Sequence, residues 1–408
     1  MDAGAFVVED LRGTRRSLRI AVVTETYPPE VNGVAMTVGR LVEGLLRQGH
    51  TIQLVRPRQH DADRPGAADG YEEILRHGVA IPRYDGLRMG LPAKAALVRR
   101  WSRQRPDVVQ IVTEGPLGWS ALGAARKLGL PVVSDFHTNF HSYSSHYGVG
   151  WLKRPISAYL RRFHNRTDAT FVPTARMRQD LAAEGYRNLA VVARGVDTRL
   201  FNPGRRSQAL RRGWGAGEDD LVVLHVGRLA PEKNLALLLR GFAAAADAVP
   251  GARLVVVGDG PALAQLRRAH PQHVYAGMRT GEDLAAHYAS GDLFLFPSLT
   301  ETFGNVTLEA MASGLPVVAY DYAAASEVIR DGENGLSARF DDEAAFLAAC
   351  RRAAADLSLR QSLGRAARQS VERFDWDHIA AGLAAVLEHT VRIRQGSHGD
   401  IALAFTPD

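Results

Sequence analysis

Short apolar segments of strand length alternate with helical stretches along this chain, and the whole alternation occurs twice. In the first half the apolar segments are Leu18–Thr24, Thr51–Val55, Val108–Val112, Pro131–Phe136, Ala169–Val172 and Leu189–Val192. After a predicted linker over 197–215 the pattern restarts with Leu221–Val226, Arg253–Val257, Val274–Ala276, Leu293–Phe296 and Pro316–Tyr320. Strands separated by helices form parallel sheets with helices on both faces. The sequence therefore predicts an α/β fold with two doubly wound, Rossmann-like domains facing a cleft, where ligands bind beyond the carboxyl ends of the strands.

Composition excludes several classes of protein. With 46% hydrophobic and 23% charged residues, the chain has the values of an ordinary globular protein and not of a disordered one. Its single cysteine, Cys350, excludes an internal disulfide framework and a multi-cysteine metal site. The first ten residues lack the positive region of a secretory signal, and no run of 18 apolar residues occurs. We therefore expect a cytoplasmic protein, with peripheral attachment to the inner face of the cell membrane as a further option.

Charge is distributed unevenly between the two halves. Residues 1–200 contain 29 Lys and Arg against 19 Asp and Glu, a net charge of +10, whereas the rest carries −4. Such an asymmetry attracts anionic partners to the first half, and an anionic membrane surface is one candidate. A chance excess of arginine is the alternative. Nucleic acid is not predicted as a partner, because no zinc-finger spacing or aromatic RNA-binding motif accompanies the charge.

Two common phosphate-binding signatures are absent from the sequence. No lysine follows a glycine, which excludes a P-loop. Gly258 and Gly260 follow a strand as in a dinucleotide-binding fingerprint, but Leu263 stands where the third glycine belongs. The Gly-Pro pair at 260–261 is therefore interpreted as the end of a strand and the start of a helix.

The most informative segment is SLTETFGNVTLEAMASGLP, which follows the strand Leu293–Phe296. Glu301 is expected in the loop and Glu309 inside the next helix. The residues between them place free N–H groups at the start of that helix, where unpaired donors and the helix dipole bind phosphate. The donor-binding residues predicted in this segment are Glu301, Phe303, Gly304, Asn305, Val306 and Glu309.

A second segment, Gly-Arg-Leu-Ala-Pro-Glu-Lys-Asn, follows the first strand of the second half. Its Arg228 and Lys233 place two cations at the carboxyl end of that strand, where they can neutralise a diphosphate leaving group. Only four lysines occur in the chain, so a lysine here is an uncommon choice. Cations that cap a surface helix are the alternative interpretation.

In the first half, two loops occupy corresponding places. Gly33 precedes a predicted helix from about Val34 to Gln48 and permits close approach of the backbone to a ligand. His137 follows the strand Pro131–Phe136 and can donate or accept a hydrogen bond to a sugar hydroxyl. His141 and His146 follow it, but their spacing lacks the Glu or Cys partners of a metal site, so no metal is predicted.

The stretch Trp151–Arg166 is a basic amphipathic helix. Trp151, Ile156, Tyr159, Leu160 and Phe163 are expected to share one face. Such a helix can lie on a membrane surface, although packing against its own sheet is the more ordinary arrangement.

Together these motifs resemble the retaining glycosyltransferases of family 4, which have the two-domain GT-B fold, over Leu18 to Val391. The resemblance implies that Arg228 and Lys233 contact the donor diphosphate, and that Glu301 and Glu309 contact the donor sugar and the ribose. It also places the Gly33 loop by the phosphates and His137 by the transferred sugar. No cofactor or metal is required in that family. The Asp-x-Asp triplets at 61–63 and 375–377 follow no strand, which disfavours a metal-dependent GT-A enzyme.

The resemblance also implies a domain organisation. A tail over 1–17 precedes an acceptor-binding domain over 18–196, and a nucleotide-sugar-binding domain extends over 197–374. A helix over 375–395 packs back on the first domain and is followed by a tail over 396–408.

Within the family, TETYPPEVNGVA, FHTNF and ARGVD are similar to the branch that glycosylates lipids, including GDP-mannose-dependent α-mannosyltransferases and sulfoquinovosyl-diacylglycerol enzymes. Arg194 replaces an Asn that many relatives carry, which suggests a contact with an acidic acceptor or phosphate, or else an internal ion pair. Tyr27, Asn139 and Arg194 are the predicted acceptor-binding residues, and His137, Arg228, Lys233 and Glu301 are the predicted catalytic ones.

The sequence thus predicts retaining, metal-independent transfer of a hexose, with mannose from GDP-mannose as the best candidate, to a hydroxyl of a membrane glycolipid or diacylglycerol-type lipid. The alternatives are a soluble or polysaccharide acceptor with a UDP-sugar donor, an epimerase, or a non-catalytic module that binds sugar nucleotides.

Overall fold

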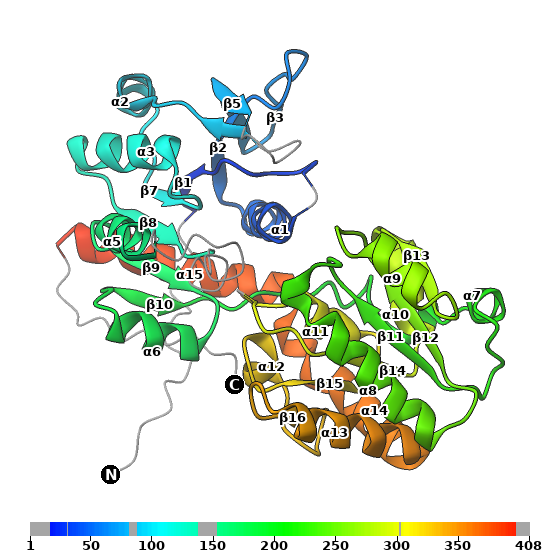
Figure 1. The fold of residues 1–408 in the computed structure, drawn as a ribbon. Helices are drawn as coiled ribbons and strands as arrows, with labels where there is room; N and C mark the ends of the chain where they lie inside the picture. The colour runs from blue at the N-terminus through cyan, green and yellow to red at the C-terminus, as the bar shows by residue number, and fades with distance from the viewer. Residues whose placement is uncertain (1–16, 31, 81–87, 138–152, 302, 397–408) are drawn as a thin grey trace, which may run out of the picture. The chain divides into compact units, whose positions relative to one another are not determined.

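The computed structural model describes residues 17–30, 32–80, 88–137, 153–301 and 303–396. In this part of the chain two compact units form (Figure 1). The first comprises the described residues up to Asp135, residues 165–170 and those from Ala380 onward, and the second comprises the remainder up to Ile379. The boundary between 196 and 197 stays a prediction.

The first sheet has eight strands in the order β10-β9-β8-β7-β1-β2-β4-β3. They are β1 (Arg19–Val23), β2 (Thr51–Pro57), β3 (Ala67–Ala68), β4 (Tyr71–Arg76), β7 (Val108–Ile111), β8 (Val132–Asp135), β9 (Ala169–Val172) and β10 (Leu189–Val191). β1 pairs in parallel with both β2 and β7, and it lies within the sheet with its apolar side chains buried on both faces. Only the short β3 pairs antiparallel, with β4.

Three helices of the first unit connect these strands, and a small hairpin accompanies them. The helices are α1 (Gly33–Arg47), α2 (Lys94–Arg103) and α3 (Pro116–Lys127), and the hairpin consists of β5 (Gly78–Ala80) and β6 (Arg88–Gly90). Asn32 caps α1 by accepting the N–H groups of Val34 and Ala35. The predicted helix from Val34 to Gln48 is therefore confirmed to within one residue.

The second unit is built on a six-stranded parallel sheet in the order β13-β12-β11-β14-β15-β16. Its strands are β11 (Val222–Val226), β12 (Arg253–Val257), β13 (Val274–Gly277), β14 (Leu293–Phe296), β15 (Val317–Tyr320) and β16 (Leu336–Ala338). The strand order reverses between β11 and β14. In a doubly wound sheet the loops at the carboxyl ends of two such strands diverge and leave space for a ligand.

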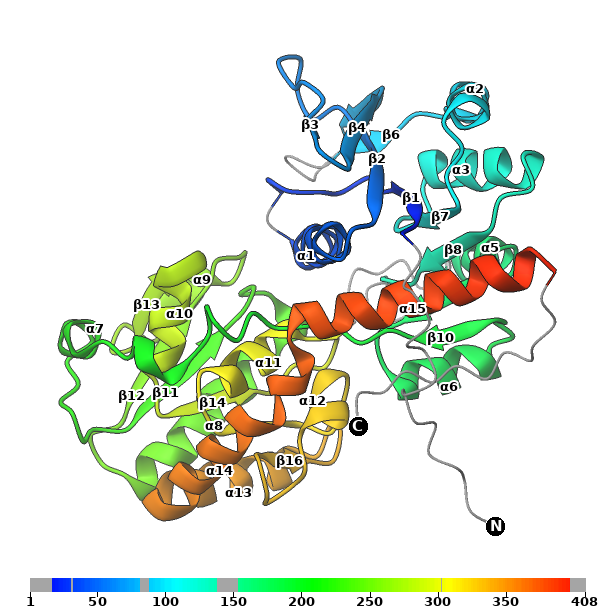
Figure 2. The ribbon, with the colours of Figure 1, turned by 180° about the vertical axis from the view of Figure 1, so that it is seen from behind.

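Helices cover both faces of this second sheet (Figures 1 and 2). On one face Leu295 of β14 contacts the region where Gly241 of α8 meets Phe346 of α13. On the other face Phe294 packs with its ring centroid 5.8 Å from that of Tyr288 of α10. Adjacent residues of one strand thus point to opposite layers, as the period of a strand requires.

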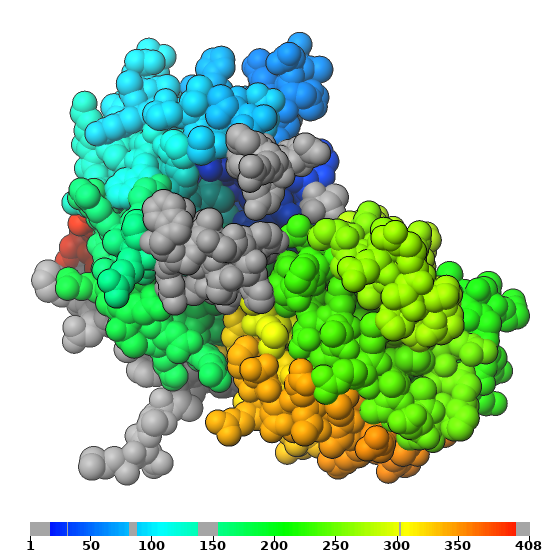
Figure 3. All heavy atoms as spheres, in the orientation of Figure 1, coloured from blue at the N-terminus to red at the C-terminus, as the bar shows by residue number. Residues whose placement is uncertain are grey.

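The second unit has helices between its strands, as the alternating pattern predicted, although the sequence analysis gave a range only for the first of them and for the final helix. They are α5 (Lys153–His164), α6 (Ala175–Ala183), α7 (Gln208–Gly213), α8 (Leu235–Ala248), α9 (Leu263–Ala269), α10 (Gly281–Ala289), α11 (Asn305–Ala312), α12 (Ala324–Val328), α13 (Glu343–Ala355) and α14 (Leu357–Ser370). Three 3₁₀ turns, η3 (Pro203–Arg205), η4 (Pro231–Lys233) and η5 (Glu372–Phe374), accompany them. The segments between α7 and α14 form one closely packed body, coloured green to orange in Figure 3. The last helix, α15 (Trp376–Arg394), belongs to the second unit up to Ile379 and to the first from Ala380.

One expectation about local structure was wrong, and several short elements were not predicted. The predicted linker over 197–215 contains η3 and α7, because the fully buried Arg211 donates to Asp292 and to the carbonyls of Gly217 and Asp220. The segment between β2 and β4 contains the short strand β3, both residues of which are exposed. The sequence analysis also missed β4, β5, β6 and β16, which are short or too polar to form apolar runs.

Helix α5 packs on its own unit. Leu160 is buried in a cluster with Phe136, Val172 and Leu181, with Ile156 packed against it. Tyr159, predicted on the same face, is 44% exposed, which corrects that assignment; Trp151 lies outside the described residues. No helix in the described part of the chain is long and apolar enough to cross a bilayer.

Candidate functional site

The loops that follow β11 and β14 bring Lys233 and Glu301 together. Lys233 Nζ forms an ion pair with Glu301 Oε1, and both side chains are mostly buried, with 15% and 13% of their surface exposed. Ser298 Oγ donates to the same carboxylate oxygen over 2.7 Å. The lysine ammonium also lies 5.7 Å from the centre of the Phe296 ring. Two residues that are 68 positions apart are thus neighbours because β11 and β14 are adjacent strands.

Arg228 occupies a different environment. Its side chain is 51% exposed, and Nη1 lies 3.7 Å from Glu232 Oε1, while Glu232 itself is buried. An exposed guanidinium with one distant carboxylate partner remains available for a second anion. The structure therefore places Arg228 at the carboxyl end of β11 as predicted, next to the Lys233 turn.

The helix α11 begins beside this ion pair. Gly304 is its N-cap, with a φ of 93° that strongly favours glycine. The N–H groups of Asn305 and Val306 have no acceptor among the residues that the structure describes. Phe303 is 2% exposed and its carbonyl accepts the N–H of Ala324, which fixes the loop before the helix. Two free donors at the N-terminus of a helix make a position that suits phosphate oxygens.

Glu309 lies one turn further along α11, and its carboxylate has one donor in the described residues. Tyr288 Oη of α10 donates to Glu309 Oε2 over 2.8 Å. Burial raises the pKa of Glu309 to about 7, and the hydrogen bond from Tyr288 partly offsets that increase. The sequence analysis missed Tyr288, because it belongs to no motif and lies 21 residues before its partner.

His225 of β11 is a second residue that the sequence analysis missed. Its ring stacks against Phe294 and Phe296, and Nδ1 is 3.0 Å from the Leu295 carbonyl oxygen. Burial lowers the pKa of His225 to about 4, opposed by that carbonyl contact and assisted by the charge of Lys233. A neutral histidine beneath the Lys233 turn therefore adds no further positive charge there at neutral pH.

His137 and Arg194 contact each other within the second unit. Arg194 Nη2 lies 3.0 Å from His137 Nδ1, and the guanidinium lies 6.0 Å from the centre of the Phe303 ring. Arg194 is only 6% exposed. The loop after β8, the segment after β10 and the loop before α11 thus converge on one another. Arg194 thus contacts the rings of His137 and Phe303, and its predicted role toward the acceptor stays a prediction.

The remaining predicted residues lie elsewhere. Gly33 opens α1 in the first unit, where its carbonyl accepts Thr37 Oγ1 over 2.7 Å. Tyr27 lies in the preceding turn, and burial raises the pKa of its hydroxyl. Asn139 falls outside the described residues. The structure does not test whether Gly33 and Tyr27 act together with the residues of the second unit.

The glycines at 258 and 260 have a packing role. A Cβ on Gly258 would clash with the Gly227 carbonyl oxygen, and one on Gly260 would clash with the Leu229 carbonyl oxygen. Both glycines have a positive φ. They let the loop after β12 pass close to the loop after β11, which supports the interpretation that they are not a dinucleotide fingerprint.

No group of three or more His, Cys, Asp or Glu side chains able to hold a metal ion occurs among the described residues. The two Asp-x-Asp triplets have local partners. Asp63 is paired with Arg56 at 2.6 Å, and Asp375 accepts from Thr198 and from the N–H of Asp377.

Two family profiles match this chain. Residues 31–200 match "Glycosyltransferase Family 4" and residues 220–356 match "Glycosyl transferases group 1". A GDP-mannose-dependent alpha-mannosyltransferase of Mycobacterium tuberculosis is 36% identical over 363 residues, covering 85% of this chain and 93% of that protein. The chain belongs to glycosyltransferase family 4.

Further comparisons agree with this assignment. Sulfoquinovosyl transferase SQD2 of Arabidopsis thaliana is 34% identical over 386 residues, covering 92% of this chain and 74% of that protein. Sucrose-phosphate synthase of Thermosynechococcus elongatus has a related structure, with a TM-score of 0.74, 18% identity, and coverage of 91% and 98% of the two chains. This family 4 glycosyltransferase therefore has the predicted GT-B fold of two Rossmann-like domains, and the predicted retaining, metal-independent chemistry fits its family.

Proposed function

We propose that this glycosyltransferase transfers a mannosyl unit from GDP-mannose to a hydroxyl group of a membrane glycolipid or diacylglycerol-type lipid, with retention of the anomeric configuration. The observation that carries the donor assignment is the cluster of Lys233, Glu301 and Ser298 next to the N–H groups at the start of α11 that have no acceptor among the described residues. A cation and two amide donors close together suit a diphosphate, and an adjacent carboxylate suits sugar hydroxyls.

In the proposed reaction the bond between the anomeric carbon and the diphosphate breaks while the acceptor hydroxyl bonds to that carbon from the same face. The hydroxyl proton passes to the departing diphosphate. Lys233 and Arg228 stabilise the negative charge that develops on the leaving group, together with the N–H groups of Asn305 and Val306. Lys233 lies in η4 and the two N–H groups lie in α11, so little reorganisation of these three donors is needed when the charge appears.

The two carboxylates have separate tasks in this proposal. Glu301, whose side chain lies beside Lys233, accepts hydrogen bonds from the transferred sugar. Glu309, one turn into α11, accepts hydrogen bonds from the ribose hydroxyls. His137 binds a hydroxyl near the reacting carbon and is oriented by Arg194. Gly33, with Phe303 and Gly304, allows close approach of backbone to the donor.

The choice of donor and acceptor is supported by the relatives. The 36% identical protein is named for GDP-mannose and mannosyl transfer, and the 34% identical one is named for a sulfoquinovosyl group. Other relatives at 26–27% identity are named alpha-monoglucosyldiacylglycerol synthases. Names of this kind point to lipid acceptors more than to soluble ones. A UDP-sugar donor with a soluble or polysaccharide acceptor is the competing possibility.

Two measurements on the full-length protein test the proposal. Thermal unfolding with GDP-mannose, UDP-glucose and ADP-glucose identifies the donor, because a ligand that binds only the native state raises the melting temperature. Transfer of label from the stabilising sugar nucleotide is then measured with diacylglycerol and glycolipid acceptors in detergent, and with soluble sugars. We expect stabilisation by GDP-mannose and transfer to lipid. Stabilisation by UDP-glucose alone with transfer only to soluble sugars would refute both choices.

A pair of lysine variants tests the site itself. Lys233→Ala should lower kcat/KM for the donor by roughly tenfold to a hundredfold, the effect of losing one charge-assisted contact to phosphate. Lys127→Ala, which removes an exposed lysine from the end of α3, is the matched control and should leave turnover unchanged. Equal turnover in both variants would remove Lys233 from the mechanism.

A further inference from the structure

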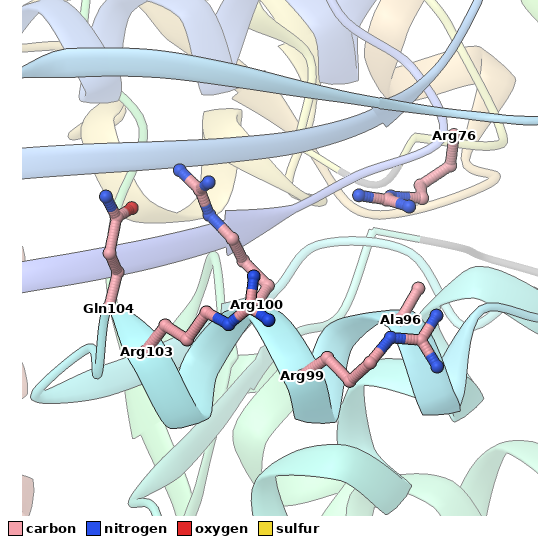
Figure 4. A pocket seen from close by; sticks show the side chains of 6 residues that line it. All are labelled: Arg76, Ala96, Arg99, Arg100, Arg103 and Gln104. Atoms are coloured by element: carbon pink, nitrogen blue, oxygen red, sulfur yellow. The ribbon is translucent and has the colours of Figure 1, made fainter.

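A cluster of arginines in the first unit lies outside everything described above. A pocket of about 330 Å³ is lined by Arg76, Ala96, Arg99, Arg100, Arg103 and Gln104. Figure 4 shows the four arginine side chains around one open hollow, three of them from α2 and Arg76 from the end of β4. No motif of the sequence analysis included these residues.

The fold holds these cations together by burying the opposite side of α2. Leu97 and Trp101 are both fully buried and anchor the helix. Arg99 and Arg103, four residues apart, therefore lie on the outer side of the same helix and are both exposed. Arg76 comes from a different element, so the pocket has two walls and is not merely a row of charges along one helix.

The positive charge of the pocket is poorly compensated. Arg100 is paired with Glu72, but in the described part of the chain no carboxylate partner accompanies Arg76, Arg99 or Arg103. Nε of Arg76 and Nε of Arg100 are buried without an acceptor there. Burial and the charges of Arg100 and Arg99 also lower the pKa of Arg76. Four like charges gathered with one acidic neighbour repel one another, and an anion in the pocket would relieve that repulsion.

We propose that this pocket binds the phosphate groups of a polyanion that carries a phosphate monoester or a diphosphate. Guanidinium groups present paired N–H donors that match phosphate oxygens, and several of them together favour a ligand with more than one negative charge. The volume of about 330 Å³ exceeds that of a single phosphate ion, so the pocket has room for further atoms of the ligand. The ligand is either a soluble diphosphate or the exposed phosphate of a lipid headgroup.

The site is independent of the proposed donor site, since it shares no residue with it and belongs to the other unit. Its test therefore measures binding and not turnover. Inorganic pyrophosphate is titrated into the full-length protein by calorimetry, as a function of salt. The variants are Arg99→Gln with Arg103→Gln, and Arg76→Gln alone. The matched control is Arg126→Gln with Lys127→Gln, which removes the same charge from the exposed end of α3 in the same unit.

We expect the pocket double variant to weaken pyrophosphate binding by at least about tenfold, and Arg76→Gln by a similar factor, whereas the control pair changes it little. A Lys233→Ala variant identifies any additional pyrophosphate binding at the donor site. This variant should retain the pyrophosphate binding that the pocket variants lose. Thermal unfolding of each variant confirms that the first unit is folded. If the pocket and control variants lose binding equally, the effect reflects net charge alone and the proposal is overturned. The proposal is also overturned if neither pyrophosphate nor the vesicles described below bind to the protein.

Vesicles distinguish the two sources of the ligand. Phosphatidylcholine vesicles containing phosphatidic acid expose a phosphate monoester, whereas those containing phosphatidylglycerol at equal surface charge expose only a diester. Preference for phosphatidic acid that is lost in the pocket variants, with competition by pyrophosphate, supports a lipid headgroup as the ligand. Binding of pyrophosphate without such a preference supports a soluble ligand. Vesicle binding alone, insensitive to the pocket variants, contradicts the site.

Discussion

Glu25 in the first unit and Glu309 in the second carry the same electrostatic perturbation in different surroundings. Burial raises the pKa of each carboxyl to about 7. Glu25 Oε1 accepts the backbone N–H groups of Gly90 and Leu117, each over 3.3 Å, and a nearby Glu114 raises its pKa further. Glu309 accepts instead from a single side chain, the hydroxyl of Tyr288.

The difference teaches that a raised pKa does not by itself identify a ligand-binding group. Glu25 occupies the N-terminus of α3, and a Cβ on Gly115 would clash with its carboxylate, so the side chain is built into the packing of three loops. Glu309 Oε1 has no hydrogen-bond donor among the described residues and remains able to accept one. We therefore propose that Glu25 contributes to stability, and the donor-binding role of Glu309 stays a proposal.

Alanine substitution of Glu25 and of Glu309 should give the largest difference between the two positions, in activity and in stability. Glu309→Ala should lower kcat/KM for the donor by roughly tenfold to a hundredfold with little change in thermal unfolding. Glu25→Ala should leave two backbone donors unsatisfied and cost about 1–3 kcal/mol of stability, while Glu25→Gln restores an acceptor and most of that loss. Steady-state kinetics and denaturant unfolding check both. Similar kinetic defects from the two alanine variants would break the comparison.

The pH dependence of donor binding sharpens the comparison between Glu25 and Glu309. If the ribose binds only the ionised Glu309, the donor KM is constant above the carboxyl's pKa of about 7 and rises about tenfold per pH unit below it, because protonation removes the acceptor. Glu309→Gln should abolish this edge, whereas Glu25→Gln should leave it in place. Initial rates between pH 5.5 and 8.5, in buffers of constant ionic strength, decide the matter. If the donor KM still rises below pH 7 in the Glu309→Gln variant, another group is responsible for this pH dependence.

The smallest expected effect concerns Tyr288. Its hydroxyl stabilises the ionised Glu309, so Tyr288→Phe should move the pH edge upward and raise the donor KM near neutral pH by roughly threefold, the value of one modest hydrogen bond. At high pH the variant and the parent should converge, since Glu309 is then ionised in both. A loss in kcat that is the same at every pH would indicate a packing defect, because Tyr288 is fully buried against Phe294 and Phe201.

The fold was predictable to a large extent, because parallel strands buried on both faces leave continuous apolar runs in the sequence. Segments such as Leu293–Phe296 became β14 without a change of boundary. Strand β4, with the sequence YEEILR, was missed because its two glutamates have partners that distant segments supply: Glu73 binds Arg56 of β2, and Glu72 binds Arg100 of α2. The predicted linker failed for the same reason, since Arg211 becomes buried only where Asp292 accepts it.

The residues of the candidate site also fall into those that local sequence identified and those that it did not. Lys233, Glu301 and Glu309 were identifiable from local sequence, because loops at strand ends and the first turns of helices have characteristic residues. Tyr288, His225 and the pairing of Arg194 with His137 were not, since each depends on a neighbour far away in sequence.

The sequence alone predicted a two-domain family 4 glycosyltransferase with cations and carboxylates at the ends of its strands. Short-range periodicity and motif spacing carry that information. Only the tertiary structure decided which partly buried carboxyl accepts from backbone N–H groups and which accepts from a tyrosine hydroxyl. It also decided which four arginines gather at one pocket, where Arg100 alone has a carboxylate partner among the described residues. Burial and charge compensation depend on atoms contributed by distant segments, so no local pattern records them.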